Sequence, residues 1–470
     1  MNEQDTIEQE IDAYVPAPRA EDGGLAHEFV ESVQVAIGKG DQTELLALTE
    51  PLHEADLGDL IEALQVDERP GLVRLLGDSF DFAALTELDE AIRAAILEEM
   101  PAQDVAEGIS ELESDDAVFI LEDLDQADQD AILEQIPLTD RVQLQRSLDY
   151  PEESAGRLMQ TDFIAIPPFW TVGQTIDYMR VEKELPESFF EIFVVDPAFR
   201  LLGSVPLDKL LRSKRGRKIT KILKETAEPI RATEDQEDVA RQFERYNLVS
   251  AAVVDESDRL VGVLTVDDIL DVLEEEAEED FRALAGVGDE EISDSILDTV
   301  KGRFAWLTVN LGTAVVASLV IGLFDATIEH MVALAVLMPI VASMGGNAGT
   351  QTMTVAVRAL ATRDIGRYNA ARVILREMSV GVLNGLLFAV LIGLVAGIWF
   401  SSPALGGIIG TAMIINMIAA GLAGILIPIT LDKLNIDPAI ASGVFVTTVT
   451  DVVGFFAFLG LAAWWFGLGM

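Results

Sequence analysis

Long stretches without a charged residue dominate the last third of the chain. They run over Phe304–Phe324, Met331–Val357, Met378–Leu431 and Pro438–Met470, the last interrupted only by Asp451. A helix rises 1.5 Å per residue, so about 20 apolar residues cross the hydrocarbon core of a bilayer. The third run has 54 residues and contains a turn signal at Ser401–Gly407, so it predicts two spans. The sequence therefore predicts an all-α transmembrane domain of five helices over residues 303–470.

Asp451 is the only charged residue between Pro438 and the C-terminus. A carboxylate in the middle of a bilayer costs about 2.5–3.5 kcal/mol to insert, so such residues usually mark an ion path. This single position favours a transporter or channel.

The net charge of −48 is very unevenly distributed. From Arg303 onward there are seven acidic and seven basic residues, which leaves 73 acidic and 25 basic residues in 1–302. The chain therefore joins an acidic soluble half to a neutral membrane half, and we expect no nucleic-acid partner. It has no cysteine and three histidines, so any bound metal should be a hard cation held by oxygen atoms.

Arginine placement predicts the orientation of the spans. The loop after the second span carries Arg358, Arg363, Arg367, Arg372 and Arg376, whereas the loop between the first two spans has no lysine or arginine. Positive loops stay on the cytoplasmic side. The acidic half is then cytoplasmic, and the protein is expected in the cytoplasmic membrane of the cell.

Two segments of the soluble half repeat 59 residues apart. "FVVDPAFRLLGSVPLDKLL" and "AVVDESDRLVGVLTVDDIL" align without gaps, each with a strand, an acidic turn, a strand and a helix. Repeated units of this kind usually pack on one another. The pair resembles tandem cystathionine-β-synthase (CBS) domains, which are α/β regulatory modules, here at residues 151–215 and 216–275.

The resemblance to CBS domains implies that a hydroxyl residue and an aspartate after the second strand can hold a ribose. The second repeat has Thr265 and Asp268, whereas the first has Pro206 where the hydroxyl would be. One site for ATP is therefore conceivable. The alternative is that Thr265 only caps the following helix.

Residues 25–150 show apolar i, i+3, i+4 spacing, with acidic residues at the other positions. "AILEEMP" and "AILEQIP" recur 36 residues apart, which favours a small α-helical superhelix. We expect residues 1–24 to form a disordered tail.

An acidic segment connects the second repeat to the first span. Nine of the 14 residues in 267–280 are acidic and none is basic, within a helix expected over 268–300. Like charges one turn apart destabilise a helix by a few tenths of a kcal/mol per pair. Divalent cations bridging these acids to neighbouring acids would remove the repulsion. The alternative is a solvated acidic face in an organism that lives in high salt.

The second span contains "PIVASMGGNAGTQT", in which small residues and a proline weaken the helix around two amides. Such polar groups at membrane depth are tolerated beside a cavity or a partner. Close packing through small residues explains Gly345 and Gly349, but not Asn347 and Gln351.

This segment, "DPAIASGVFVTTVTDVVGFFAFLGLA" in the last span and "YPEESAGRLM" resemble the MgtE family of magnesium channels and transporters. The resemblance follows nearly the whole chain in the same order. It implies a homodimer in a lipid membrane, with Mg²⁺ as substrate and regulator. It also implies an ion site at Asp451, with a pore wall formed by Gly346, Asn347, Gln351 and Thr447.

The resemblance further implies that the connecting helix is a plug that senses internal Mg²⁺. The expected ligands are acidic residues of that helix and of the helical N-domain: Asp268, Asp271, Glu275, Glu276, Glu279, Asp280, Asp115 and Asp116. Bound ions would close the pore when internal Mg²⁺ rises.

Three other functions remain open at this stage. The chain could carry a broader range of divalent cations, such as Co²⁺, Ni²⁺ or Mn²⁺. It could also be a nucleotide-regulated transporter of another solute, or a membrane-anchored regulatory protein. We find no pattern of catalytic residues, so we do not expect an enzyme.

Overall fold

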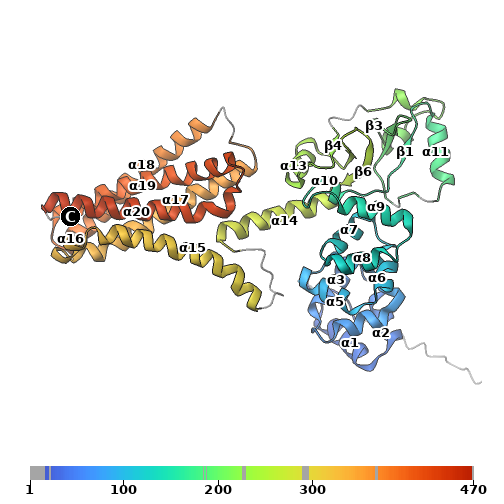
Figure 1. The fold of residues 1–470 in the computed structure, drawn as a ribbon, viewed down its shortest axis with the longest axis horizontal. Coiled ribbons are helices and arrows are strands. Elements are labelled where there is room, and N and C mark those ends of the chain that lie inside the picture. Colours follow the sequence, from blue (N-terminus) through green and yellow to red (C-terminus); the bar gives the residue numbers. More distant parts are fainter. Residues whose placement is uncertain are drawn as a thin grey trace, which may run out of the picture. The chain divides into compact units, whose positions relative to one another are not determined.

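The computed structural model describes residues 16–20, 23–183, 185–186, 188–224, 229–287, 296–365 and 369–467 (Figure 1). The chain divides into two compact units, Met1–Glu274 and Glu275–Met470, and the division falls within one helix. Of the predicted disordered tail, residues 1–15 and 21–22 lie outside the described residues. Arg19 lies within that range and forms ion pairs with Asp56 and Asp59.

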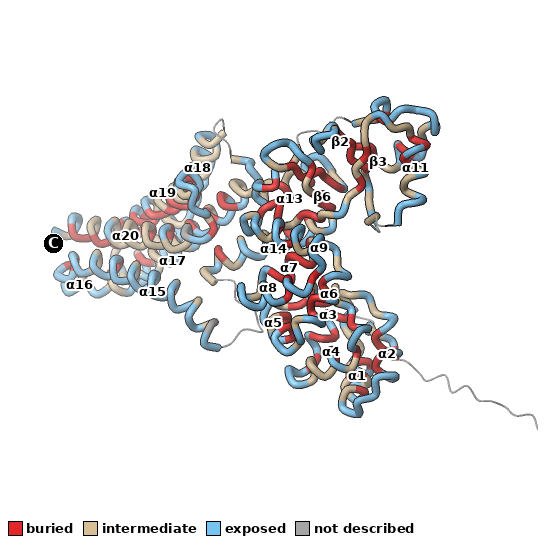
Figure 2. The backbone as a smooth tube through the Cα atoms, turned by 45° about the vertical axis from the view of Figure 1, so that its right-hand side comes forward, coloured by how far each residue is buried: buried red, intermediate tan, exposed pale blue. Residues whose placement is uncertain are grey.

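The first unit begins with short helices that share one apolar core (Figure 2). Prolines and capping residues keep these helices short: Pro101 and Pro137 each precede a helix, and Asp125 accepts hydrogen bonds from the first turn of another. The helices are α1 (His27–Lys39), α2 (Gln42–Thr49), α3 (Glu54–Ala63), α4 (Arg69–Leu76), α5 (Glu90–Glu99), α6 (Ala102–Ile109), α7 (Ser114–Glu122), α8 (Gln126–Leu133) and α9 (Leu138–Leu148).

Two α/β repeats follow the helical domain. Each has one parallel and one antiparallel strand pair, and each has a register shift at equivalent positions, Val194/Val195 and Val253/Val254. The first consists of α10 (Ala155–Leu158), β1 (Ala165–Ile166), α11 (Val172–Val181), β2 (Glu191–Val195), β3 (Leu201–Pro206) and α12 (Leu207–Leu211). The second consists of β4 (Ile230–Arg231), α13 (Gln236–Tyr246), β5 (Ser250–Val254), β6 (Leu260–Thr265) and α14 (Val266–Ala285).

The two repeats pack on each other through equivalent residues. The Leu201 amide donates to the Asp258 carbonyl at 3.1 Å, and the Leu260 amide donates to the Phe199 carbonyl at 3.0 Å. A shared apolar cluster joins the two sheets around Phe193 and the second-repeat strands. The repeats therefore form a pair with approximate two-fold symmetry, as the 59-residue register predicts.

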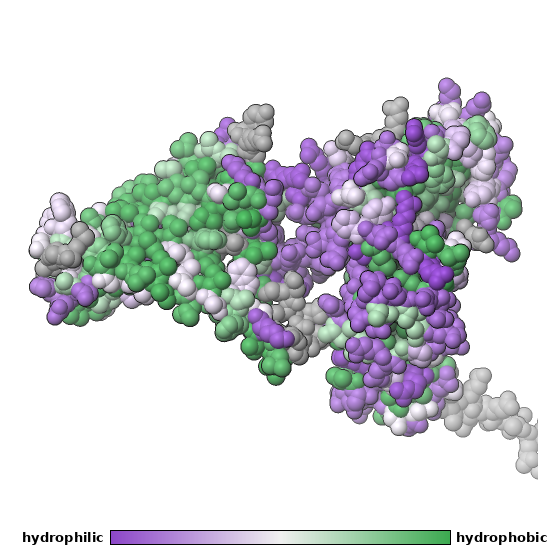
Figure 3. Space-filling view, in the orientation of Figure 1, coloured by the Kyte–Doolittle hydropathy of each residue, from purple (hydrophilic) through white to green (hydrophobic). Residues whose placement is uncertain are grey.

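The second unit is helical and strongly apolar on its surface (Figure 3). Its helices beyond α14 are α15 (Ile296–Gly322), α16 (Asp325–His330), α17 (Ala333–Ala361), α18 (Ala370–Trp399), α19 (Pro403–Lys433) and α20 (Pro438–Phe466). Five of them are long and apolar enough to cross a membrane, which confirms the predicted number of spans. Helix α19 is the most buried span, and it packs against α17, α18 and α20.

Two of the spanning helices are longer than the uncharged runs suggest. Helix α17 continues to Ala361 and includes Arg358, and α18 begins at Ala370 and includes Arg372 and Arg376. Basic residues therefore lie within the ends of these two helices, beyond the uncharged runs. Arginine is a good helix former, so a charge ends an apolar run without ending the helix.

The end of α14 packs against the transmembrane helices of its own unit. Ala283 belongs to a buried cluster with Met353 and Val357 of α17 and with Ala439 and Val446 of α20. The connecting helix was expected to reach residue 300. In the structure α14 ends at Ala285, and residues 288–295 lie outside the described part of the chain.

Candidate functional site

Helices α17 and α20 approach closely because α17 carries glycine where they meet. A Cβ atom added to Gly349 would lie 2.6 Å from the Val446 side chain, well inside van der Waals contact. Gly345, one turn earlier, has a similar role against α19, where an added Cβ would lie 2.1 Å from the Asn416 amide nitrogen. Small-residue packing therefore accounts for these two glycines.

The polar residues of α17 lie on other faces of the helix. Asn347 is exposed and aligns with Thr350 and Thr354 at i, i+3 and i+7, so α17 carries a polar stripe on its surface. The two threonines are not among the residues predicted for the pore wall. Gly346 is half-buried, and no atom lies within 4 Å of an added Cβ there.

On α20, Thr447 and Asp451 are one turn apart and both half-buried. The Thr447 hydroxyl donates to backbone carbonyls of the preceding turn, at 3.0 Å from Gly443 and 3.1 Å from Val444. The structure thus gives α20 a hydroxyl and a carboxylate on one face, within a unit whose spans are otherwise mostly apolar.

Asn416 of α19 lies beside this region and was not foreseen from the sequence. It is fully buried, and its amide donates to the Val341 carbonyl of α17 at 2.8 Å. Its side chain fits between glycines of two other spans: an added Cβ would lie 2.1 Å from its amide nitrogen at Gly345 and 2.7 Å at Gly454. The Asn416 side-chain oxygen has no hydrogen-bond partner. This residue therefore links three spans close to Asp451.

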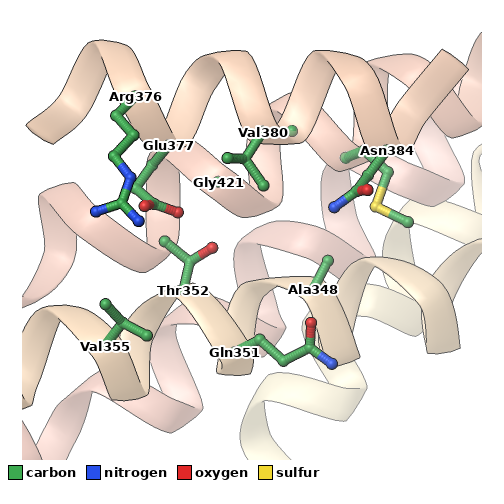
Figure 4. A pocket seen from close by; sticks show the side chains of 11 residues that line it. Ala348, Gln351, Thr352, Val355, Arg376, Glu377, Val380, Asn384 and Gly421 are labelled. Carbon is green, nitrogen blue, oxygen red and sulfur yellow. The ribbon is translucent and has the colours of Figure 1, made fainter.

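Gln351 lies one turn after Asn347, on the same exposed side of α17, and also lines a cavity of about 250 Å³ between α17, α18 and α19 (Figure 4). Thr352 of α17 and Arg376, Glu377 and Asn384 of α18 also line this cavity. In Figure 4 the side chains of Arg376 and Glu377 lie next to each other on α18. The assignment of Gln351 to the pore wall stays a prediction.

Three acidic residues of the first unit converge between the helical domain and the second repeat. Asp115 and Asp116 come from the first turn of α7, and Asp268 comes from the first turn of α14. Asp115 is 9% exposed, and its Oδ1 atom has no hydrogen-bond partner. Helix α7 is held there by the Ser114 hydroxyl, which accepts a hydrogen bond from the Thr161 amide at 2.7 Å.

Burial and mutual repulsion make these carboxyl groups reluctant to ionise. Burial, Asp268 and Glu113 together raise the pKa of Asp116 to about 7. Burial and the neighbouring Asp268 and Asp116 raise the pKa of Asp115 well above its usual value. Burial also raises the pKa of Asp268. A cation placed among them would favour the charged forms.

The other predicted sensor residues lie in two different places. Asp271 of α14 lies near Glu87, and burial followed by the charge of Asp271 raises the pKa of Glu87. Asp280 belongs to the second unit, where burial followed by the charge of Asp437 raises its pKa. The remaining predicted ligands, Glu275, Glu276 and Glu279, are also on α14 in the second unit.

Among the described residues, no group of three or more histidine, aspartate or glutamate side chains is arranged to hold a metal ion directly. Mg²⁺ often binds through only one or two carboxylates and keeps several waters. The unpartnered Asp115 oxygen facing Asp268 and Asp116 therefore fits a hydrated Mg²⁺ better than a fully dehydrated one.

The predicted nucleotide residues interact with each other. The Thr265 hydroxyl donates to the Asp268 carboxylate at 2.6 Å, and the Thr265 amide donates to the same oxygen at 3.3 Å. A ribose hydroxyl that binds Asp268 would have to replace the Thr265 hydroxyl as a hydrogen-bond donor to this carboxylate. Asp268 is therefore shared between the predicted nucleotide site and the acidic cluster.

Comparisons with known proteins agree with this architecture. Residues 338–461 match the MgtE family of divalent cation transporters, residues 52–153 match the MgtE intracellular N domain, and residues 222–275 match the CBS domain. The chain thus combines a polytopic transporter domain with cytosolic-type regulatory domains.

Relatives extend over most of the chain. The magnesium transporter MgtE of Thermus thermophilus is 33% identical over 445 residues, which are 93% of this chain and 98% of that protein. The magnesium transporter MgtE of Enterococcus faecalis is 35% identical over 321 residues, 68% of this chain and 71% of that protein. A crystal structure of the cytosolic domain of the Mg²⁺ channel MgtE in complex with ATP is 29% identical, covers 52% of this chain and 99% of that chain, and has a TM-score of 0.48. This chain belongs to the MgtE family of magnesium transporters.

Proposed function

We propose that this protein imports Mg²⁺ across the cytoplasmic membrane as a homodimer and that internal Mg²⁺ closes it. Asp451 carries the proposal, because it is a half-buried carboxylate on a spanning helix whose other residues from Pro438 onward are uncharged. In a two-fold dimer, two such carboxylates repel each other until a dication lies between them. Mg²⁺ sheds water reluctantly, so carboxylates and hydroxyls such as Thr447 would hold it through its hydration shell.

Closure depends on the acidic residues of the cytoplasmic half. Without Mg²⁺, Asp115, Asp116 and Asp268 repel one another or stay protonated. Two unit charges 4 Å apart interact by about 4 kcal/mol at an effective dielectric near 20. Shifting a two-state gate from about 1% closed to about 99% closed needs about 5.5 kcal/mol. The binding of a few ions is therefore sufficient to close it.

The end of α14 is placed to transmit this change. Ala283 packs against α17 and α20, which are the helices that carry Asn347 and Asp451. A shift of α14 would therefore act directly on the helices that form the proposed pore. We propose Asp271, Glu275, Glu276, Glu279 and Asp280 as further ligands along this helix.

Flux of Mg²⁺ into liposomes containing the purified protein tests the proposal. We expect uptake that decreases as Mg²⁺ on the cytoplasmic side rises. Equal uptake of Co²⁺, Ni²⁺ and Mn²⁺ would favour the broader divalent transporter instead. Flux that responds to ATP but not to cytoplasmic Mg²⁺ would favour nucleotide regulation through Thr265 and Asp268.

A further inference from the structure

Helices α17 and α18 each pack more on α19 than on each other, and a space remains between them. Glycines set this arrangement. A Cβ atom added to Gly381 of α18 would lie 2.8 Å from the Met417 carbonyl of α19. One added to Gly424 of α19 would lie 2.8 Å from the Thr352 Cβ atom of α17. Because the close contacts of both helices are with α19, α17 and α18 stay apart beside it.

Two adjacent cavities lie in this space, with volumes of about 250 Å³ and about 220 Å³. Both are lined by Thr352 and Val355 of α17 and by Arg376 and Glu377 of α18. In Figure 4 the Arg376 and Glu377 side chains extend from α18 toward Thr352. Val355 is 58% exposed, and Val380, which lines the larger cavity, is 41% exposed. Apolar residues therefore surround the opening of a cavity that holds two charged groups.

The two charged groups of the cavity are not paired within the protein. Neither the Arg376 guanidinium nor the Glu377 carboxylate forms an ion pair or a hydrogen bond with another of the residues that the structure describes. Asp364, which lines the smaller cavity, differs: its carboxylate accepts a hydrogen bond from the Thr362 hydroxyl at 2.8 Å. Unpaired charges in a spanning helix are costly, so a ligand that pairs with both would stabilise this arrangement.

The depth of these groups corresponds to the polar boundary of a bilayer. Helix α18 has 30 residues and is therefore about 45 Å long, close to the thickness of a bilayer with its headgroups. The hydrocarbon core takes about 30 Å of this length, which leaves about 7 Å at each end. Arg376 follows the first residue of α18, Ala370, by about 9 Å along the helix. Arg376 and Glu377 therefore lie near the level at which headgroups meet hydrocarbon.

We propose that this cavity binds the headgroup of a phospholipid that carries a primary amine, such as phosphatidylethanolamine. The Arg376 guanidinium would donate hydrogen bonds to the phosphate, and the Glu377 carboxylate would accept them from the ammonium group. The acyl chains would contact the exposed valines of the opening and the apolar surface of the second unit (Figure 3). The bound lipid would fill the space between α17 and α18. This inference is independent of which ion the protein carries.

Lipid retention by the purified full-length protein tests the proposal. The protein would be reconstituted in an equal mixture of phosphatidylethanolamine, phosphatidylglycerol and phosphatidylcholine. It would then be transferred to a mild detergent, and the lipids that remain bound would be identified by native mass spectrometry. We expect phosphatidylethanolamine to be retained in preference to the other two. Phosphatidylglycerol lacks the ammonium group, and the quaternary ammonium group of phosphatidylcholine has no N–H to donate.

Three variants of the cavity separate the two contacts. Arg376→Gln should lower the retention of phosphatidylethanolamine about tenfold, as expected when a hydrogen bond between charged groups is lost. Glu377→Gln should remove the preference over phosphatidylglycerol, because the phosphate contact remains. Val380→Trp would fill the cavity with both charges in place and should also lower retention. The matched controls, Arg372→Gln on α18 and Asp432→Asn on α19, change exposed charges outside the cavity and should leave retention unchanged.

Four other outcomes would overturn the lipid site. Equal retention of the three lipids, or a similar loss in Arg372→Gln, would mean that the cavity does not select the lipid. Loss of phosphatidylethanolamine when EDTA is added would mean that a divalent cation bridges the phosphate to Glu377 in place of the ammonium group. Displacement by phosphoethanolamine in solution would identify the free headgroup compound as the ligand. Ion flux is not measured here, so each of these results would leave the proposed function intact.

Discussion

Individual residues define the proposed ion path. Asp451 supplies the only charge of α20 beyond Pro438, and Asn416 joins the spans around it through the Val341 carbonyl. An ionised or polar group in a spanning helix needs water, an ion or a polar partner. We propose that Asp451 meets this need by binding an ion, whereas Asn416 meets it through the hydrogen bond that links α19 to α17.

The first prediction concerns Asp451. Asp451→Asn keeps the size and removes the charge, so Mg²⁺ flux in liposomes should fall at least about tenfold, as expected for loss of the main ion ligand. Asp432→Asn, which changes an exposed acid at the end of α19, is the matched control and should transport normally. Normal flux in Asp451→Asn would remove this residue from the ion path.

The second prediction concerns Asn416. Asn416→Ala removes the hydrogen bond to Val341 and leaves the space between Gly345 and Gly454 partly empty. The positions of α17 and α20 should then vary, so the preference for Mg²⁺ over Ca²⁺ and Na⁺ should weaken in flux measurements. The free energy of unfolding should fall by about 2–4 kcal/mol, as expected when a buried side chain and its hydrogen bond are removed.

A control on the same helix separates positioning from stability. Ile409→Ala also removes a fully buried side chain of α19, in a different apolar cluster. It should lower stability to a similar degree with unchanged ion preference. A similar loss of preference in both variants would show that Asn416 acts only through stability.

At the scale of elements, α14 runs from the acidic cluster of the first unit into the second unit. Its first turn contributes Asp268 to the acidic cluster, and its last turns pack Ala283 against α17 and α20. We propose that α14 transmits a displacement from the acidic cluster to the spans. The acidic residues along its length repel one another, so its position should depend on bound cations.

The third prediction concerns the middle of this helix. Glu276→Gln with Glu279→Gln should produce a protein that stays open when cytoplasmic Mg²⁺ is high, because two proposed ligands are lost. Flux measured against cytoplasmic Mg²⁺ would show the half-closing concentration shifted upward several-fold. Glu256→Gln with Asp258→Asn, in the turn of the second repeat, is a control of equal charge. Unchanged closure in the first pair would exclude a sensor role for Glu276 and Glu279.

At the scale of the whole molecule, protons would compete with the proposed Mg²⁺ ions for the same acidic groups. The pKa values of Asp115, Asp116 and Asp268 are raised in the folded protein, with that of Asp116 at about 7. The folded state therefore binds more protons than the unfolded state between about pH 4 and pH 7. This contribution to stability is present at low pH and is lost as the pH rises through the folded pKa.

The fourth prediction follows from this loss of stability as the pH rises. In metal-free buffer, the thermal unfolding temperature should fall from about pH 6 to about pH 8, as these groups lose their protons. Mg²⁺ should restore it at the higher pH and have less effect at the lower pH, because metal binding releases protons. Asp115→Asn should reduce both the pH dependence and the Mg²⁺ effect. If the effect of Mg²⁺ on the unfolding temperature did not depend on pH, Mg²⁺ would bind away from these three carboxyl groups.

Much of the architecture could be predicted from the sequence because its signals are local. Apolar runs of sufficient length predict five spans, and the 59-residue register predicts the paired repeats. The uncharged runs are shorter than α17 and α18, because Arg358, Arg372 and Arg376 are helical. Gln351, which the motif assigns to the pore wall, lies one turn from Asn347 on α17 and also lines the cavity between α17 and α18.

The sequence by itself determined the membrane spans, the lone charge at Asp451 and the separation of the acidic half, because hydropathy and charge are properties of single residues. Only the tertiary structure decided that Asp115 meets Asp268 and that Asn416 joins three helices. These contacts join residues far apart in the chain, and packing determines which of many compatible partners come together. Sequence periodicity indicates which face of a helix is buried, but it does not identify the residue that covers that face.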